Sequence, residues 1–334
     1  MPRKLLLASL AVATMPLSVA ATSAPTYTVA QSIAGPDGSW DYARADEDGT
    51  HVYVARSTSV TVIDTATGKV STLGTVQRGH AVVPLRGGKL LVTSGTDGTV
   101  RLFDTRSGAQ TANIVVGKKP DAAILDASGA HAFVMNADSG TVSVIDLAAA
   151  KVTGTISVKP ALEYAAFGSD GTLFINNEDS DEIETVDVTR GVMGKAIALP
   201  GCKAPTGLGY DVAHGRLIAA CANGKAAIVD ARSRRLTALV DIGVGPDAVI
   251  MDEARGLAFV PCGKDGVLDI LSISGSVVTH AGAVKTEVGA RTGALDPKTG
   301  AIYLPTAKFD APAAGGGRPA MVPGSFHVLV VKRA

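Results

Sequence analysis

The stretch AFVMNADSGTVSVIDLAAAKVTGTISV, residues 132–158, decides the fold, because it reads as extended segments separated by tight turns. Apolar side chains alternate with polar or small ones in each segment, which is the pattern of half-buried strands. The pair Ser139-Gly140 lies between two of them, and such pairs supply the positive φ that a tight hairpin needs. The strands predicted for this unit are residues 121–126, 131–136, 141–146 and 152–158.

The same four-stranded unit recurs along the chain. The third strand ends on an aspartate in phrases similar to SVIDLAAAK, and these aspartates recur at intervals of 40 to 43 residues. They are Asp64, Asp104, Asp146, Asp187 and Asp230, and Ser272 takes the position in the following copy. A period of about 40–45 residues with four strands is typical of propeller blades. We expect the aspartates to cap the turn between the third and fourth strands, which is a structural role.

Seven copies of the unit fill the chain. Their bounds are 34–76, 77–116, 117–158, 159–200, 201–242, 243–284 and 285–332. The last copy lacks a fourth strand, whereas the segment TYTVAQSI (26–33) precedes the first copy and has the pattern of one. The sequence therefore predicts an all-β, seven-bladed propeller that the N-terminal strand closes by completing the last blade, which removes exposed sheet edges. The alternative is an open solenoid, but it would need capping repeats that the sequence does not show.

The N-terminal segment has the order of a secretory signal. Arg3 and Lys4 precede an apolar run, and small residues follow at 20–24. We expect a signal peptide at 1–24, a single propeller domain at 25–334, and a periplasmic or secreted mature protein. The apolar run is short for a span and Pro16 interrupts it, so no membrane span is expected after cleavage. We also expect a monomer.

The composition argues against several classes of function. Basic and acidic residues number 31 each, so the formal net charge is zero, and nucleic acid is not an expected partner. Aromatic residues make up 4% of the chain with a single Trp, whereas quinone-binding dehydrogenase propellers use a Trp in every blade. The sequence contains no G-x-S-x-G elbow, phosphate loop or haem motif.

Three cysteines are present: Cys202, Cys221 and Cys262. Cys202 precedes the first strand of the fifth blade and Cys221 ends its second strand, and antiparallel neighbours bring those ends together. A Cys202–Cys221 disulfide is therefore expected, with Cys221–Cys262 as the second choice and buried free thiols as the remaining alternative.

The repeat also identifies equivalent positions at the predicted mouth of the central channel, where loops on a rigid scaffold commonly form ligand sites. A first ring lies five residues before the end of each first strand: Asp41, His80, Asp121, Glu163, Thr206, Asp247 and Arg291. A second ring ends each second strand: Arg56, Ser94, Asn136, Asn177, Cys221, Cys262 and Thr306.

We expect the two rings to form a polar bowl, and two interpretations of it remain open. In the first, its carboxylates and amides hold one Ca²⁺, or Zn²⁺ if His80 joins, with His80, Asp121, Glu163 and Asp247 as candidate ligands. In the second, each aspartate binds loop amides at the start of its strand, and this structural interpretation is favoured for Asp121 and Asp247. His80, Glu163 and Arg291 depart from the pattern and are the better functional candidates.

An insertion at 307–325 falls between two strands of the last blade on the same predicted face. At this length a loop is often a lid or binding element, and Arg318 and Met321 are its candidate contacts, although an excursion without a role is the alternative. Few aromatic side chains are available for stacking on a sugar, and we expect Trp40, Tyr42, Tyr164 and Tyr210 near the same mouth.

Several segments resemble the YVTN-type β-propeller repeat family. The second strands carry Tyr53-Val54-Ala55-Arg56, Phe133-Val134-Met135-Asn136 and Phe174-Ile175-Asn176-Asn177, and the junctions KPD (119–121) and GPD (245–247) are similar to that family's loop. The resemblance covers essentially the whole mature chain. It implies an exported propeller but no particular chemistry.

The predicted function is that of an exported binding or scaffold protein, which recognises a small ligand or an envelope protein at the channel mouth. The alternative is a metal-dependent lactone or ester hydrolase, because a bound cation would polarise a carbonyl and activate water. Some six- and seven-bladed propellers are similar in being metal-dependent lactonases with Glu, Asn and Asp ligands. An accessory protein for a redox enzyme is a third possibility, by analogy of fold alone.

Overall fold

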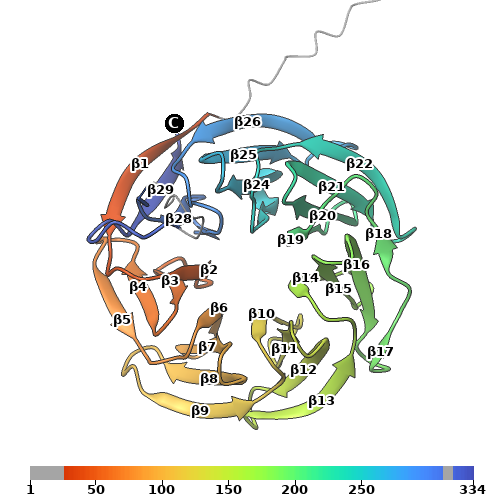
Figure 1. The fold of residues 1–334 in the computed structure, drawn as a ribbon, viewed down its shortest axis with the longest axis horizontal. Coiled ribbons are helices and arrows are strands. Elements are labelled where there is room, and N and C mark those ends of the chain that lie inside the picture. The colour runs from red at the N-terminus through yellow and green to blue at the C-terminus, as the bar shows by residue number, and fades with distance from the viewer. Residues whose placement is uncertain (1–25, 311–318) are drawn as a thin grey trace, which may run out of the picture.

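The computed structural model describes residues 26–310 and 319–334. Its strands form seven antiparallel sheets arranged in a ring around a central channel (Figure 1). The fold is therefore the predicted seven-bladed, all-β propeller. The predicted signal peptide lies outside the described residues.

The first four blades follow chain order from the channel outward. Blade 1 contains β2 (Trp40–Ala45), β3 (His51–Arg56), β4 (Val60–Asp64) and β5 (Val70–Leu73). Blade 2 contains β6 (Gly79–Leu85), β7 (Lys89–Ser94), β8 (Thr99–Asp104) and β9 (Gln110–Val115). Blade 3 contains β10 (Pro120–Leu125), β11 (His131–Asn136), β12 (Thr141–Asp146) and β13 (Lys151–Ser157). Blade 4 contains β14 (Leu162–Phe167), β15 (Thr172–Asn177), β16 (Glu182–Asp187), β17 (Val192–Met193) and β18 (Ile197–Ala198).

The remaining three blades complete the ring. Blade 5 contains β19 (Pro205–Asp211), β20 (Arg216–Cys221), β21 (Lys225–Asp230) and β22 (Arg235–Asp241). Blade 6 contains β23 (Ile250–Asp252), the 3₁₀ turn η1 (Glu253–Arg255), β24 (Leu257–Cys262), β25 (Val267–Ser272) and β26 (Thr279–Lys285). Blade 7 contains β27 (Ala294–Leu295), β28 (Ile302–Thr306), β29 (His327–Arg333) and β1 (Tyr27–Ala34).

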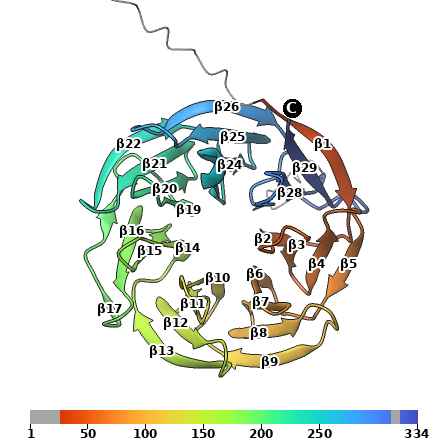
Figure 2. The ribbon, with the colours of Figure 1, turned by 180° about the vertical axis from the view of Figure 1, so that it is seen from behind.

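The N-terminal strand closes the ring as predicted. β1 pairs antiparallel with β29, from Tyr27 opposite Arg333 to Ala34 opposite His327. Seen from behind, β1 is the outermost strand beside the chain's C-terminus (Figure 2). The Tyr27 ring also packs edge-on against Phe259 of blade 6, with 5.1 Å between ring centroids. The closing strand therefore holds two blades together.

Two regions depart from the predicted four regular strands. The outer strand of blade 4 is divided into β17 and β18, which both pair with β16. Gly194 lies at the division, where a Cβ would lie 2.5 Å from Thr185 Oγ1, so the close approach of the two strands there requires glycine. The innermost strands of blades 6 and 7 are also short, at three and two residues.

The repeated aspartates cap turns, as predicted. Each accepts a hydrogen bond from the backbone N–H three residues further on, in the turn between the third and fourth strands. These are Asp64, Asp104, Asp146, Asp187 and Asp230.

Cys202 and Cys221 form a disulfide with 5.4 Å between their Cα atoms. It ties the loop before β19 to the end of β20. Cys262 is a buried free thiol that donates a hydrogen bond to Asp269 Oδ2 at 3.3 Å. Burial and the charge of Asp269 raise the pKa of Cys262, which favours the protonated thiol over the reactive thiolate.

Candidate functional site

The first ring of equivalent residues gathers at one mouth of the channel, which we call the upper mouth. All seven members line one cavity of about 790 Å³: Asp41, His80, Asp121, Glu163, Thr206, Asp247 and Arg291. Each lies at the channel-facing start of a blade, where the innermost strands converge (Figure 1). The structure therefore brings these predicted residues together.

A repeated irregularity in the sheets presents the ring side chains to the channel. In blades 1 to 5 the pairing between the first two strands shifts register just after the first strand begins, as between Trp40 and Ala43 or Pro120 and Ala123. The skipped residues include the ring member, such as Asp41 or Asp121. Such a bulge re-aims side chains that would otherwise alternate across the sheet. The regular period of the repeat gave no signal for these bulges.

Charged groups outside the predicted rings also line the upper mouth. Arg78 and Lys119 precede the ring residues of blades 2 and 3 by two positions, and Glu178 follows the end of β15. Sequence reasoning missed them, although their fixed offset from the repeat could have identified Arg78 and Lys119. The cavity therefore contains five carboxylates against Arg78, Lys119, Arg291 and a histidine.

Asp41, His80 and Asp121 form the tightest polar cluster. His80 Nδ1 lies 2.6 Å from Asp41 Oδ2 and 3.8 Å from Asp121 Oδ1. Burial lowers the pKa of His80, but the hydrogen bond with Asp41 and the charges of both aspartates outweigh it and raise this pKa overall. His80 Nε2 is buried without a hydrogen-bond partner in the described part of the chain, and it lies beside Gly95, where a Cβ would be 2.8 Å away.

The cluster could bind a metal ion. Asp41, His80 and Asp121 can each offer one ligand atom, and these atoms lie within 4.8 Å of one another. Of the four predicted metal ligands, only His80 and Asp121 belong to this group. Glu163 and Asp247 lie outside it, and Asp41 takes part instead. His80 would have to exchange its hydrogen bond with Asp41 for a metal bond through Nδ1.

The carboxyl group of Asp121 has no hydrogen bond within the described residues, although the residue is only 5% exposed. Lys119 Nζ is 3.7 Å away. Burial and the nearby charge of Asp41 raise the pKa of Asp121 to about 7. The expected bonds to loop amides are absent here, so the structural interpretation of Asp121 is wrong.

Glu163 and Asp247 experience the same crowding of negative charge. Burial raises the pKa of Glu163 well above its usual value, and the charges of Asp121 and Asp247 add to the effect. Burial likewise raises the pKa of Asp247 to about 6, although Arg291 Nε donates to its Oδ2 at 2.9 Å. Asp247 thus pairs with Arg291 rather than with a loop amide. The upper mouth therefore gathers five carboxyl groups around three cationic side chains and His80.

The variant Asp121→Asn is expected to be more stable than the wild type at pH 8, by roughly 1–3 kcal/mol. An acid whose pKa is raised by folding destabilises the fold as pH rises from its unfolded value near 4 to its folded value near 7. The gain should therefore vanish at pH 4, where Asp121 is protonated in the fold. Urea unfolding at both pH values measures it, with Asp187→Asn at an exposed turn as the matched control. If Asp121→Asn is less stable than the wild type at pH 8, the ionised Asp121 carboxylate does not destabilise the fold, which would contradict this account.

The second predicted ring does not reach the upper mouth, which corrects the expected bowl. Arg56 donates to the carbonyl oxygens of residues 36, 38 and 39 and lies 3.7 Å above the Phe326 ring. Asn136 donates to Thr141 and Ser143 in the adjacent strand.

Asn177 is placed in the same way, since it donates to Pro160 O and Glu184. All three side chains are buried within their blades and hold loops and hairpins in place. End-of-strand positions look equivalent to the first ring in the sequence. They differ because the bulges interrupt the strand pairing only at the first-ring positions, whereas the second-ring residues stay paired within their sheets.

The ends of the 307–325 insertion contribute an apolar wall. Phe309 and Met321 form an isolated bridge, and both line the upper mouth with Pro319. The Phe309 ring lies 6.1 Å from that of Trp40. Arg318 lies outside the described residues.

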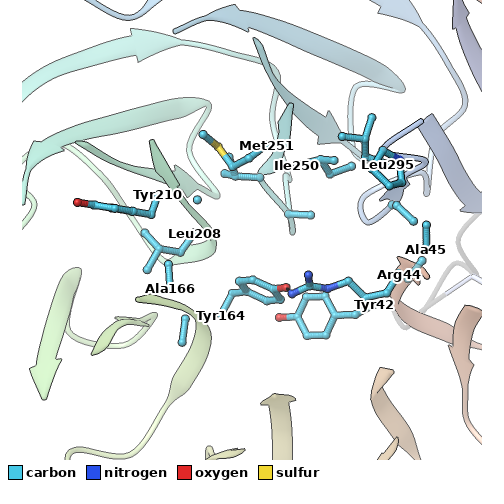
Figure 3. A pocket seen from close by; sticks show the side chains of 18 of the residues that line it. Tyr42, Arg44, Ala45, Tyr164, Ala166, Leu208, Tyr210, Ile250, Met251 and Leu295 are labelled. Atoms are coloured by element: carbon cyan, nitrogen blue, oxygen red, sulfur yellow. Dashed lines mark hydrogen bonds between the residues drawn. The ribbon is translucent and has the colours of Figure 1, made fainter. Parts of the chain in front are cut away.

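Two of the four aromatic residues expected near this mouth belong to the opposite one, which we call the lower mouth. Trp40 and Tyr42 line the upper mouth, whereas Tyr164 and Tyr210 line a cavity at the lower mouth (Figure 3). Tyr42 lines both, because its ring packs against that of Tyr164 across the channel at 5.1 Å. Tyr42 OH also donates to Glu163 Oε2 at 3.4 Å. The aromatic side chains of Tyr42 and Tyr164 thus meet across the channel, and Tyr42 borders both cavities.

Comparisons with known proteins support the fold alone. No family model and no curated protein matches the sequence. Many solved structures match the fold, among them a chain of "Kuenenia stuttgartiensis Hydrazine Synthase", with a TM-score of 0.71 and 15% identity over 87% of this chain and 96% of that one. A chain from "Crystal Structure of Mitotic Checkpoint Complex" has a TM-score of 0.71 and 16% identity over 99% of this chain and 98% of that one. In the described residues, no helix is long and apolar enough to cross a membrane.

Proposed function

We propose that the protein is an exported binding protein whose upper mouth takes a small organic cation with an apolar body. The observation that carries this proposal is the convergence of Asp41, Asp121, Glu163 and Asp247 on one open cavity. Burial raises the pKa of Asp121, Glu163 and Asp247, and repulsion from neighbouring carboxylates adds to this effect. A cation would relieve that repulsion, whereas an anion would increase it.

The rest of the cavity determines what kind of cation fits. Trp40, Phe309 and Met321 form one wall, and aromatic and apolar surface of this kind binds the hydrocarbon part of a ligand. The volume of about 790 Å³ falls within the range of small-molecule sites. An arylalkylamine combines both features, with its ammonium group towards Asp121 and Glu163.

Export and family membership are part of the proposal. The basic-then-apolar N-terminal sequence and the Cys202–Cys221 disulfide favour an oxidising compartment outside the cytoplasm. The tetrapeptides on β3, β11 and β15 favour the YVTN-type repeat family.

Isothermal titration with 2-phenylethylamine at pH 8 tests the binding function. The matched probes are 2-phenylethanol, which is neutral, and 3-phenylpropionate, which is anionic. We expect saturable binding of the amine, weakened at least about tenfold in Asp121→Asn/Glu163→Gln and unchanged in Asp187→Asn. Any binding of 3-phenylpropionate or 2-phenylethanol should be the same in the wild type and in Asp121→Asn/Glu163→Gln. We also expect weaker binding at pH 5, because protonation removes the negative charge. An amine that fails to bind at about 10 mM, or that binds the double variant equally well, would refute the proposal.

A metal-dependent hydrolase of lactones or esters is the second candidate, and the cluster of Asp41, His80 and Asp121 favours it. Three protein ligands leave a coordination position open for water or substrate, as in catalytic zinc sites. Elemental analysis of protein purified without chelator tests it. About one Zn²⁺ or Ca²⁺ per chain, lost in His80→Ala, would support the hydrolase, and a metal-free chain whose stability is indifferent to both ions would exclude it.

A further inference from the structure

The lower mouth differs chemically from the upper one. Its cavity of about 380 Å³ is lined largely by apolar and aromatic side chains, including Tyr164, Leu208, Ile250, Met251 and Leu295 (Figure 3). A neighbouring hollow of about 420 Å³ continues this surface with further apolar residues such as Val83 and Phe167. Both hollows share one cationic side chain, Arg44 of β2.

Arg44 has no acidic partner among the described residues. Its guanidinium carbon lies 5.5 Å from the centre of the Tyr164 ring, and its only side-chain hydrogen bond is donated to Tyr164 Oη. A guanidinium has five N–H donors, so most of the fork is left for another acceptor. Burial lowers the pKa of Arg44, and no carboxylate opposes that effect.

The two acids that line the same cavity do not compensate this charge. Asp46 accepts hydrogen bonds from Thr50 Oγ1 at 2.9 Å and from the His51 backbone N–H at 3.0 Å, and its Oδ2 lies 3.1 Å from His51 Nδ1. Glu47 is exposed and has no ion pair in the described part of the chain. A partly buried guanidinium therefore faces a largely apolar cavity and forms no ion pair within the described residues.

We propose that the lower mouth is a second binding site, which takes a small monocarboxylate with an apolar body. The carboxylate pairs with the guanidinium fork of Arg44, which presents parallel N–H donors suited to two oxygens of one acid. The hydrocarbon part lies against Ile250, Met251 and Leu295. A dianionic phosphate fits less well, because the cavity has no second cation.

This site is independent of the proposed amine site. The two cavities share Tyr42 but no charged residue, and the carboxylates of the upper mouth repel an anion. Failure of one proposal therefore leaves the other standing. Together they describe a channel whose two ends select ligands of opposite charge.

Calorimetric titration of the full mature chain with 4-phenylbutyrate tests the proposal, with 4-phenylbutanol as the uncharged control. We expect saturable binding of the acid, weakened about tenfold to a hundredfold in Arg44→Met, with Arg44→Lys intermediate because it keeps the charge but loses the fork. Binding of the alcohol should be equal in wild type and Arg44→Met. Asp121→Asn/Glu163→Gln should bind the acid as the wild type does.

Two results would overturn the proposal. One is the absence of 4-phenylbutyrate binding at about 10 mM, and the other is equal affinity in wild type and Arg44→Met. The thermal transition of each variant shows that it is folded. If Arg44→Met does not fold, loss of affinity in the folded Arg44→Lys decides in favour, and unchanged affinity there decides against.

Discussion

A chain that begins at residue 35 is expected to lose its cooperative unfolding transition and to aggregate. Removing β1 takes away the strand that pairs with β29 along its length, together with the buried side chains of Tyr27 and Ile33. Burial of each such side chain is worth about 1.5–3 kcal/mol, and the lost backbone pairing adds to this. The sum approaches the roughly 5–15 kcal/mol net stability of a typical domain. Differential scanning calorimetry measures the transition.

The control for this truncation is a chain that begins at residue 25, which should unfold cooperatively. The open edge of β29 offers unpaired backbone groups to any extended segment. A synthetic peptide of residues 26–35 should therefore restore a transition by strand addition. A truncated chain with the same midpoint as the control would contradict closure of the ring by β1.

Asp211→Ala is expected to lower the free energy of unfolding by about 3–5 kcal/mol. Asp211 is 1% exposed, and its Oδ2 accepts from Arg216 Nε at 2.9 Å and Nη2 at 2.6 Å. Arg216 also donates to Ile273 O and Gly275 O, which connects blade 5 to blade 6. Removing the carboxylate leaves a buried guanidinium without its counter-charge. Urea unfolding at pH 7 measures the loss.

Asp187→Ala is the matched control, because that exposed aspartate accepts a single backbone N–H in its turn. It should cost no more than about 1 kcal/mol. Equal losses in the two variants would show that the buried ion pair adds nothing beyond an ordinary turn contact.

The sequence predicts the fold well because the repeat is regular. The predicted strands 131–136 and 141–146 coincide with β11 and β12, and the stray N-terminal segment becomes β1. The alternation of apolar residues and the turn glycines specify strands and turns locally, so both can be recognised in a single sequence. The divided outer strand of blade 4 shows the limit, because the close approach at Gly194 depends on how the two strands pair and not on the period of the repeat.

The site is predicted only in part. The first ring was found because equivalent positions in a repeat occupy equivalent places in space. The second ring was misplaced because the bulges that distinguish it depend on how neighbouring strands pair. Tyr164 and Arg44 lie 120 residues apart and meet across the channel, a contact that no local pattern encodes.

The chemistry of the channel follows from where charge gathers on this symmetrical scaffold. Seven similar blades give similar backbones, but the side chains at their inner ends differ. Carboxylates collect at the upper mouth, whereas apolar residues surround Arg44 at the lower one. Function in such a fold is therefore a property of these few positions rather than of the fold.

The most direct test of the central claim is a carbon-detected NMR titration of protein labelled at its Asp and Glu carboxyl groups, with 2-phenylethylamine added at pH 8. The account predicts saturable shifts of the Asp121, Glu163 and Asp247 carboxyl signals, each assigned by its amide variant, and no shift of Asp187. Unsaturable shifts spread over exposed carboxylates, or no shift at Asp121 and Glu163, would contradict a cation site at the upper mouth.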